Sequence, residues 1–328
     1  MGWQGDVVSG INRVLVTGGA GFIGSHICDA LISSGIEVVC LDNLITGKIA
    51  NIAHLENERG FNFIEGDIRD LETCMDAMEI CDAVNHQAAL GSVPRSVADP
   101  VTTHSHNATG TLNVFHAANK LGIKRVVYAS SSSTYGDEST LPKIEQKIGV
   151  PLSPYAVTKR ISEMYSTVFS SLHGMELIGL RYFNIFGPRQ DPEGMYAAVI
   201  PKFASLILDG EVPQIHGDGE QSRDFTHISN AVQANINALL TNKREAFGKN
   251  FNIACGCRIT INELYELVSS IVVDDHPEID KIKPKHVESR AGDVKHSLAD
   301  ITMARELLDY SPNVSVEEGL ISTVRSFY

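Results

Sequence analysis

The sequence predicts an α/β protein with a parallel sheet covered by helices on both faces. Short strand-like runs recur at 13–17, 37–41, 61–65, 83–87, 125–129 and 176–182, and the first is rich in β-branched residues. Helical segments separate these runs, and strands that alternate with helices are typical of parallel βαβ units. A glycine-rich turn follows the first run directly. These observations favour a doubly wound sheet with its ligand at the carboxyl ends of the strands.

The glycine turn carries Gly18, Gly21 and Gly24 at intervals of three residues. Glycine allows a tight turn and lets the backbone approach a pyrophosphate, whose charge the N-terminus of the next helix favours. The second strand ends at Asp42, where a carboxylate can hydrogen-bond a ribose 2′-hydroxyl and repel a 2′-phosphate. The pattern predicts a Rossmann-type fold that binds NAD rather than NADP. The alternative for Asp42 is a simple Asp-Asn turn.

Composition and charge indicate a globular protein and argue against several other classes. The 328 residues are 43% hydrophobic and 20% charged, as in globular proteins, and the net charge of −13 argues against nucleic-acid binding. No apolar run approaches the ~18 residues of a membrane span. The six cysteines are scattered, which predicts neither a disulfide framework nor a metal site and favours a cytoplasmic location.

The chain changes character after Asn184, where proline and glycine begin to punctuate it. We expect a tail at 1–12, a Rossmann domain with the catalytic residues at 13–185, and a smaller mixed α/β substrate lobe at 186–328. Some later segments could return to the first domain. Thr260 and Glu263 form a capping-box pattern that predicts a helix from Ile261 to Val273, and a final helix is expected from about Asp300.

The segment from Ser130 to Lys159 has the pattern of an active site. Ser153 and Pro154 predict a helix N-terminus, which places Tyr155 and Lys159 one turn apart on one face. A phenol has a pKa of about 10, and a nearby ammonium favours the phenolate. We expect Lys159 to lower the pKa of Tyr155, so that Tyr155 can exchange a proton with a sugar hydroxyl. The alternative is an ordinary surface pair.

The rest of this helix carries an apolar stripe. Its helical spacing predicts residues buried in the core, namely Ile161, Met164, Tyr165, Val168 and Leu172. In the C-terminal half, Arg223 and Arg290 could be surface residues or could clamp the diphosphate of a second ligand.

With these motifs in order, the chain resembles the extended short-chain dehydrogenase/reductase family, and within it the NAD-dependent UDP-hexose 4-epimerases. The motifs that carry this resemblance are 18–24, Asp42-Asn43, 66–70, 130–136, Tyr155 with Lys159, 181–184 and 290–293. A closer similarity is to the epimerases that interconvert UDP-N-acetylglucosamine and UDP-N-acetylgalactosamine, carried by 86–96, 131–136, 190–192 and 196–202.

The resemblance implies the roles of individual residues. Tyr155 is the base, Ser131 relays the proton and Lys159 holds the phenolate and the nicotinamide ribose. The expected cofactor site for tightly bound NAD contains Gly18, Gly21, Phe22, Ile23, Asp42, Asn43, Thr46, Gly47, Asp67, Ile68, Gln87, Ala88, Ala89, Asn107, Tyr155, Lys159 and Tyr182. The expected UDP-sugar site contains Gly91, Ser92, Arg95, Ser132, Ser133, Asn184, Gln190, Ala198, Val199, Lys202, Phe203, Gln214, His216, Arg223, Arg290, Asp293 and Ser297.

The resemblance also implies C4 epimerisation through a 4-keto sugar, a homodimer, and no membrane or nucleic-acid partner. Gly91, Ser133, Ala198 and Ser297 are small enough to leave room for a 2-acetamido group. Phe203 and Gln214 depart from the Trp and Tyr expected near the uracil.

Other functions of the same fold remain alternatives. A 4,6-dehydratase carries Thr-Asp-Glu where this chain has Ser131–Ser133, and without the carboxylates the elimination of water lacks its acid. A UDP-glucose 4-epimerase and a UDP-glucuronate 4-epimerase or decarboxylase stay open. An NAD-sensing binding protein would not need Ser131, Tyr155 and Lys159.

Overall fold

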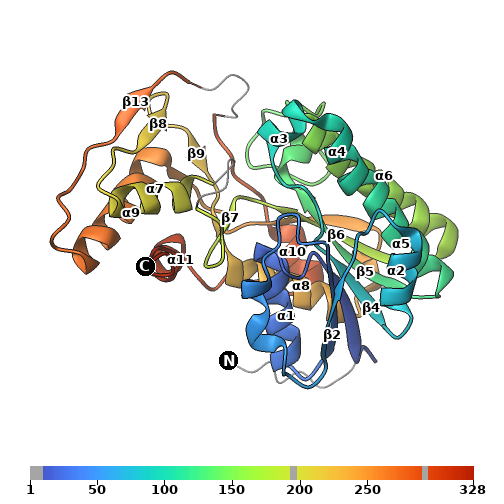
Figure 1. Cartoon of the computed structure of the whole chain (residues 1–328). Helices are drawn as coiled ribbons and strands as arrows, with labels where there is room; N and C mark the ends of the chain where they lie inside the picture. Colours follow the sequence, from blue (N-terminus) through green and yellow to red (C-terminus); the bar gives the residue numbers. More distant parts are fainter. Residues whose placement is uncertain (1–9, 193–197, 290–294) are drawn as a thin grey trace.

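A seven-stranded parallel sheet forms the centre of the larger lobe in the computed structural model, which describes residues 10–192, 198–289 and 295–328 (Figure 1). Its spatial order is β11-β6-β5-β4-β1-β2-β3, and each neighbouring pair is parallel. The predicted doubly wound α/β class is confirmed. The strands are β1 (Arg13–Thr17), β2 (Glu37–Asp42), β3 (Phe61–Glu65), β4 (Ala83–His86), β5 (Arg125–Ser131), β6 (Glu176–Tyr182) and β11 (Lys249–Ile253).

The chain order reverses beside β1, and this reversal positions the site. From β1 the chain moves outward through β2 to β3, then returns to β4 on the other side of β1. Connections that leave in opposite directions open a crevice at the carboxyl ends of the strands. Gly18, Asp42, Gln87 and Ser131 each end or follow a strand at this edge of the sheet.

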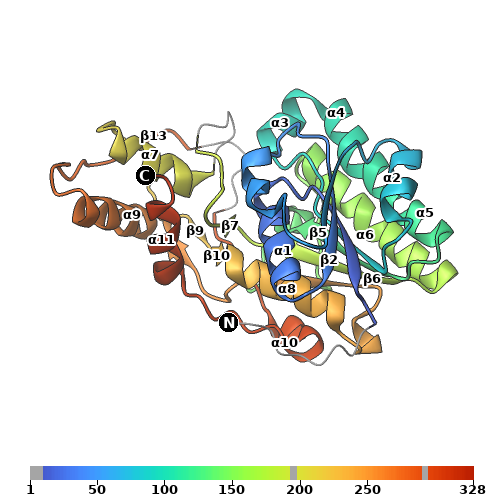
Figure 2. The same ribbon diagram turned by 60° about the horizontal axis from the view of Figure 1, so that its bottom comes forward.

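Helices cover both faces of the sheet, as Figures 1 and 2 show. Along β1, Val14 and Val16 belong to one apolar cluster and Leu15 to the other, because side chains alternate along a strand. The helices on the first face are α1 (Phe22–Ser33), α8 (Ile228–Leu240) and α10 (Thr302–Leu308). Those on the second are α2 (Leu71–Met78), α5 (Gly110–Lys120) and α6 (Pro154–His173), with α3 (Val93–Ala98) and α4 (Pro100–His104) beside α6.

Segments beyond residue 186 return to this sheet. Strand β11 pairs with β6 at the edge, and α8 packs against α1. Asn252 in β11 is fully buried and donates from its side chain to the carbonyl oxygens of Lys143 and Asp300, both at 2.9 Å. It also accepts from the hydroxyl of Tyr135 at 2.6 Å. One side chain therefore joins the sheet edge to a loop of the first half and to the segment before α10.

The smaller lobe has a core of its own, built on α7 (Val199–Leu208), α9 (Ile261–Asp275) and α11 (Val316–Arg325). Its short strands pair as β7 (Ile185–Phe186) with β10 (Thr226–His227), β8 (Gln214–His216) with β13 (Lys285–Val287), and β9 (Ser222–Arg223) with β12 (Ile259–Thr260). The capping box of α9 is present at Thr260 and Glu263. The C-terminal part contains two helices, α10 and α11, where the sequence pattern predicted one from about Asp300.

The predicted burial of the apolar stripe on α6 is wrong for most of its residues. Met164 is 59% exposed, Val168 47% and Leu172 71%. The buried face of α6 instead carries small and polar residues such as Ser162, Glu163 and Ser166. Apolar spacing alone misjudged the face that meets the sheet, because Glu163 finds charged partners inside the lobe. No helix in the described ranges is long and apolar enough to cross a membrane.

We predict that Asn252→Ala lowers the free energy of unfolding by about 1–3 kcal/mol, the usual cost of leaving buried polar groups unpaired. The carbonyl oxygens of Lys143 and Asp300 would both lose a donor. Urea unfolding measures the change. The control, Asn62→Ala at an exposed position of β3, should stay within about 0.5 kcal/mol of the parent. Equal stability of the two variants would contradict the role of Asn252.

Candidate active site

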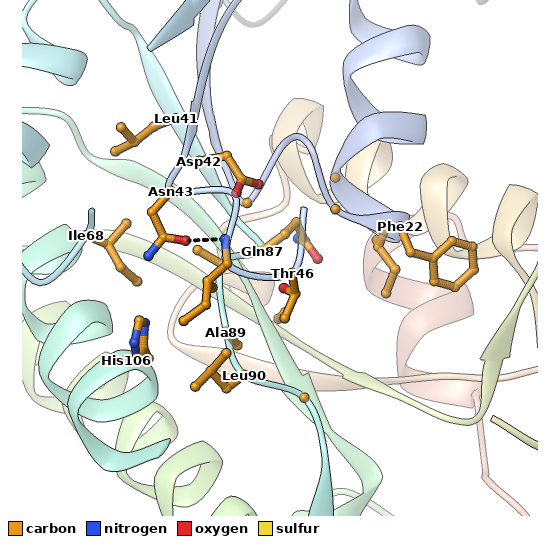
Figure 3. A pocket seen from close by; sticks show the side chains of 18 of the residues that line it. Phe22, Leu41, Asp42, Asn43, Thr46, Ile68, Gln87, Ala89, Leu90 and His106 are labelled. Carbon is orange, nitrogen blue, oxygen red and sulfur yellow. Dashed lines mark hydrogen bonds between the residues drawn. The ribbon is translucent and has the colours of Figure 1, made fainter. Parts of the chain in front are cut away.

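The main pocket opens at the carboxyl ends of β1, β2 and β4 (Figure 3). Its empty volume is about 1130 Å³ including the open mouth, which suits a ligand of cofactor size. Most of the expected cofactor residues line it, namely Gly18, Gly21, Phe22, Ile23, Asp42, Asn43, Thr46, Ile68, Gln87, Ala88, Ala89, Tyr155, Lys159 and Tyr182. Gly24, Gly66 and Ser130, which belong to motifs named from the sequence, also line it, whereas sequence reasoning missed Leu41, Ile45, Leu90, His106 and Ala129.

The glycine turn lies unusually close to the end of β4. A Cβ at Gly18 would stand 2.6 Å from the backbone nitrogen of Ala88, and Gly18 has a φ of +69°. A Cβ at Gly24 would stand 2.1 Å from the carbonyl oxygen of Gly18. Helix α1 begins directly after this turn, and no side chain caps its N-terminus. Its first amide groups are therefore available to a phosphate.

Asp42 lies at the pocket edge with its carboxylate already fixed. It accepts hydrogen bonds from the backbone nitrogens of Ala20 at 3.0 Å and Leu44 at 2.8 Å. Burial raises the pKa of Asp42, and these two hydrogen bonds oppose the shift. Gly47 does not line the pocket, but a Cβ there would meet the Asp42 carboxylate at 2.7 Å. Gly47 thus leaves room for Asp42 and does not itself face the ligand space.

Asp67 and Asn107 also lie behind the pocket wall and support residues that line it. Asp67 accepts from the side chain of Asn43 at 2.9 Å, and Arg69 holds the pKa of Asp67 well below its usual value. The side-chain oxygen of Asn107 accepts from the backbone nitrogen of Leu90 at 2.7 Å. Figure 3 shows Asn43 and Leu90 on the same side of the pocket as His106.

His106 lines the pocket, although no pattern in the sequence predicted that it would. It lies on a π-helical turn, Ser105–Thr109, inserted between α4 and α5. Such turns inside helices often occur at functional sites. The irregular turn brings His106 to the pocket, where burial lowers its pKa.

Helix α6 places Tyr155 and Lys159 in the pocket as predicted. The Ser153 hydroxyl accepts from the backbone nitrogen of Ala156 at 3.1 Å, and Pro154 occupies the first turn. The Lys159 ammonium donates to the carbonyl oxygen of Ala129 at 2.7 Å and lies 5.9 Å from the centre of the Tyr155 ring.

The pKa of Tyr155 shifts in the opposite direction to the one that we expected. Burial raises the pKa of Tyr155, and the hydrogen bond with Ser131 opposes the shift only in part. We expected Lys159 to lower this pKa. Lys159 is itself buried, which lowers its own pKa to about 8 against the influence of Glu163. Desolvation therefore dominates the pKa of both groups.

Two residues expected near the sugar have buried polar atoms without a partner among the described residues. These atoms are the Ser133 hydroxyl and the side-chain oxygen of Gln190. Ser133 lies in the short helix after β5, where its backbone nitrogen donates to the Ser131 hydroxyl at 3.1 Å. The Gln190 amide nitrogen donates to the carbonyl oxygen of Ile185 at 3.3 Å. An unpaired buried acceptor is expected where a ligand completes the hydrogen bonds.

Other residues of the expected sugar site border the first lobe. Gly91 lines the pocket and has open space around its Cβ position. Ser92 caps α3 by accepting from the backbone nitrogen of Arg95, and Ser132 begins the short helix after β5. The Asn184 amide nitrogen donates to the Asp224 carbonyl oxygen at 3.0 Å.

Among the remaining expected residues, those that the structure describes lie in the smaller lobe, and none of these lines the main pocket. Phe203 is buried in the lobe core, edge-on to Tyr265 at 5.6 Å, which leaves little of its ring for a uracil. Ala198, Lys202 and Gln214 are exposed and Val199 opens α7, while His216, Arg223 and Ser297 take part in backbone hydrogen bonds. Arg290 and Asp293 lie outside the described residues.

Comparisons with known proteins agree with this geometry. The chain is 36% identical to a UDP-glucose 4-epimerase of Mycolicibacterium smegmatis, over 96% of this chain and 98% of that protein. A solved UDP-N-acetylglucosamine 4-epimerase from Methanobrevibacter ruminantium, in complex with UDP-N-acetylmuramic acid, is 41% identical with a TM-score of 0.89 and covers 96% and 98% of the two chains.

A third relative is a Tyr-to-Phe variant of the UDP-glucuronic acid 4-epimerase from Bacillus cereus, solved with NAD and a fluorinated UDP-sugar. It is 32% identical with a TM-score of 0.87, over 96% of this chain and all of that one. The model of the NAD-dependent epimerase/dehydratase family matches residues 14–254, which run from β1 through β11. The predicted cofactor, NAD, is thereby confirmed, and the chain belongs to the NAD-dependent epimerase/dehydratase family.

Proposed function

We propose that this protein epimerises UDP-sugars at C4 and that UDP-N-acetylglucosamine and UDP-N-acetylgalactosamine are its preferred pair. One observation carries the proposal: a single pocket contains the dinucleotide-binding turn and the Tyr155–Lys159 pair. A base beside a hydride acceptor can oxidise a secondary alcohol and reduce the resulting ketone. Without an added oxidant, such a cycle inverts one carbon and regenerates its cofactor.

Each catalytic side chain has one task in this reaction. When bound, NAD⁺ accepts the hydride from C4 of the sugar and later gives it back. Tyr155 accepts the proton of the 4-hydroxyl, with Ser131 as the hydrogen-bonded relay. Lys159 places a cation near the Tyr155 ring, and a nearby cation favours the phenolate. Rotation of the 4-keto sugar about its diphosphate would present the opposite face of C4 for reduction, and Tyr155 would return the proton.

The preference for N-acetylated sugars is supported by space near the sugar. Gly91 borders the pocket with nothing within 4 Å of its Cβ position, and the hydroxyl of Ser133 has no partner among the described residues. In the proposed complex, the open space at Gly91 admits the larger 2-acetamido group, and the Ser133 hydroxyl is a polar partner for it. UDP-glucose and UDP-glucuronate stay alternatives, because the relatives named above include epimerases of both.

The direct test incubates the purified protein with UDP-N-acetylglucosamine, UDP-glucose and UDP-glucuronate, each without added NAD, and separates the C4 epimers. We expect the N-acetylated sugar to react fastest. Denaturing the protein should release NAD, since Asp42 disfavours a 2′-phosphate. An NAD-binding protein without turnover would give nucleotide but no epimer.

We predict that Tyr155→Phe reduces kcat by more than about 10²-fold, the usual effect of removing a positioned acid–base group. The fold and bound NAD should be retained, since Phe keeps the ring. The control is Tyr165→Phe on the same helix, a partly exposed residue that should keep parental activity. Turnover by Tyr155→Phe at the parental rate would show that another group is the base.

Substitution of Gly91 tests the sugar preference. Gly91→Leu should fill the open space and lower kcat/KM for UDP-N-acetylgalactosamine relative to UDP-galactose by about 10- to 200-fold, the range for excluding one substituent. The backbone of Gly91 needs no positive φ, so the fold should tolerate the side chain. NAD content serves as the control for cofactor binding. An unchanged ratio of the two kcat/KM values would place the acetamido group elsewhere.

We also propose a homodimer that buries the exposed face of α6. An apolar groove between α6 and the neighbouring segment 104–112 is lined by His104, Ala108, Thr109, Leu112, Ile161, Met164, Tyr165 and Val168. A continuous apolar surface of this kind is typical of an interface. A second copy fits it best, because the same helices facing each other form a self-complementary contact.

We predict that the double substitution Met164→Lys/Val168→Asp converts a dimer into a monomer, because charges would be buried at the interface. Light scattering coupled to gel filtration measures the mass. The same changes at exposed positions outside the groove, Val150→Asp and Ile80→Lys, form the control. A monomeric parent protein would refute the dimer.

A further inference from the structure

Glu163 is a buried carboxylate that the proposed reaction does not use. It lies on α6 one turn after Lys159, and its side chain is 1% exposed. Arg181 in β6 pairs with it through two bonds, from Nε at 2.7 Å and Nη2 at 2.9 Å. A buried charge of this kind is strongly destabilising when it loses its partner.

The contacts of Glu163 lead directly to the active site. The Ser130 hydroxyl, which borders the cofactor pocket, donates to Glu163 Oε1 at 2.6 Å. The preceding residue, Ala129, accepts from the Lys159 ammonium at 2.7 Å. Lys159 and Glu163 are therefore held by successive residues of β5. Ser130 and Ser131 have separate tasks, since one hydroxyl binds Glu163 and the other faces Tyr155.

The charged and titratable groups around the pair define its electrostatics. Lys159 faces Glu163 on its own helix and His86 from β4, which is neutral because burial lowers its pKa to about 3. Glu163 faces Arg181 and also Arg160, whose Nη1 donates at 3.0 Å from the helix surface. Burial raises the pKa of Tyr128 in β5, and the negative charge of Glu163 adds to this rise.

We propose that Glu163 is a positioning residue whose buried carboxylate, fixed by Arg181 and Ser130, keeps the Lys159 ammonium charged beside Tyr155. The inference rests on the proposed epimerase function and deepens it. Glu163 does not contact the reacting atoms. It acts through Lys159, in which burial favours the neutral amine and Glu163 opposes that tendency.

The proposal predicts the direction in which the pH dependence of activity changes when Glu163 loses its charge. Activity needs charged Lys159 and is lost as the pH rises through the pKa of Lys159. Removing the negative charge of Glu163 lowers that pKa, so the alkaline limb of the pH profile moves to lower pH. We expect Glu163→Gln to shift the limb by about one pH unit, equivalent to about tenfold in rate on the alkaline side. Glu163→Asp keeps the charge and should restore most of the parental limb.

The experiment measures kcat/KM against pH for the purified parent and variants with bound NAD, using UDP-N-acetylgalactosamine and UDP-galactose. The matched control is Glu176→Gln. Glu176 pairs with Arg125 at 2.7 Å, at the opposite ends of β5 and β6 from the pocket. That variant should lose stability without moving the limb, which separates a structural role from an electrostatic one.

Each outcome decides one point. An unshifted limb in folded Glu163→Gln overturns the inference, whereas a parent that forms no epimer at any pH overturns the proposed function instead. If Glu163→Gln fails to fold, the variant Glu163→Gln/Arg181→Gln removes both buried charges. This double variant is compared with Arg181→Gln, from which it differs only in the charge at residue 163, and its limb should lie at lower pH than that of Arg181→Gln. An unshifted limb there also overturns the inference.

Discussion

The contact between the turn after β1 and the end of β4 is the constraint on which the rest of the site depends. Gly18 meets Ala88 backbone to backbone at a distance that a side chain would prevent. This approach brings Gln87, Ala88 and Ala89 to the same pocket wall as the N-terminus of α1. The end of the pocket that we expect to bind phosphate is thus made of main-chain groups, which are held by the sheet and would cost little reorganisation on binding.

The end of the pocket at Tyr155 is surrounded by charged side chains that are buried from water. The Lys159 ammonium donates a hydrogen bond to the carbonyl oxygen of Ala129. The Glu163 carboxylate accepts hydrogen bonds from Arg181 and Ser130. The network continues from the Arg181 Nη1 to the Tyr135 hydroxyl and on to Asn252 in β11. Buried polar groups of this kind are stable only when nearly every member is paired. The network that holds Glu163 therefore joins β5, β6 and the edge strand from the C-terminal half.

The residues expected to bind the cofactor and most of those expected to bind the sugar lie in different lobes. The sheet holds the cofactor residues, which nearly all meet in one pocket, whereas the smaller lobe supplies residues that stand apart from it. Ser133 follows β5 and Gln190 bonds to Ile185 of β7, and each has a buried atom without a partner among the described residues. A ligand that spans the lobes would complete their hydrogen bonds, and its binding energy could orient the sugar against Tyr155.

The sequence by itself determined the class of fold, the glycine turn, the N-terminus of α6 and the Tyr155–Lys159 pair. These features depend on local rules: strand and helix periodicity, the φ angle of glycine, and the capping of a helix by Ser153. Only the tertiary structure decided which face of α6 is buried, because Glu163 could enter the core once Arg181 from a separate strand paired with it. It likewise decided that a π-helical turn brings His106 to the pocket and that burial raises the pKa of Tyr155. These outcomes depend on partners and on desolvation contributed by residues far apart in the chain, which no local pattern encodes.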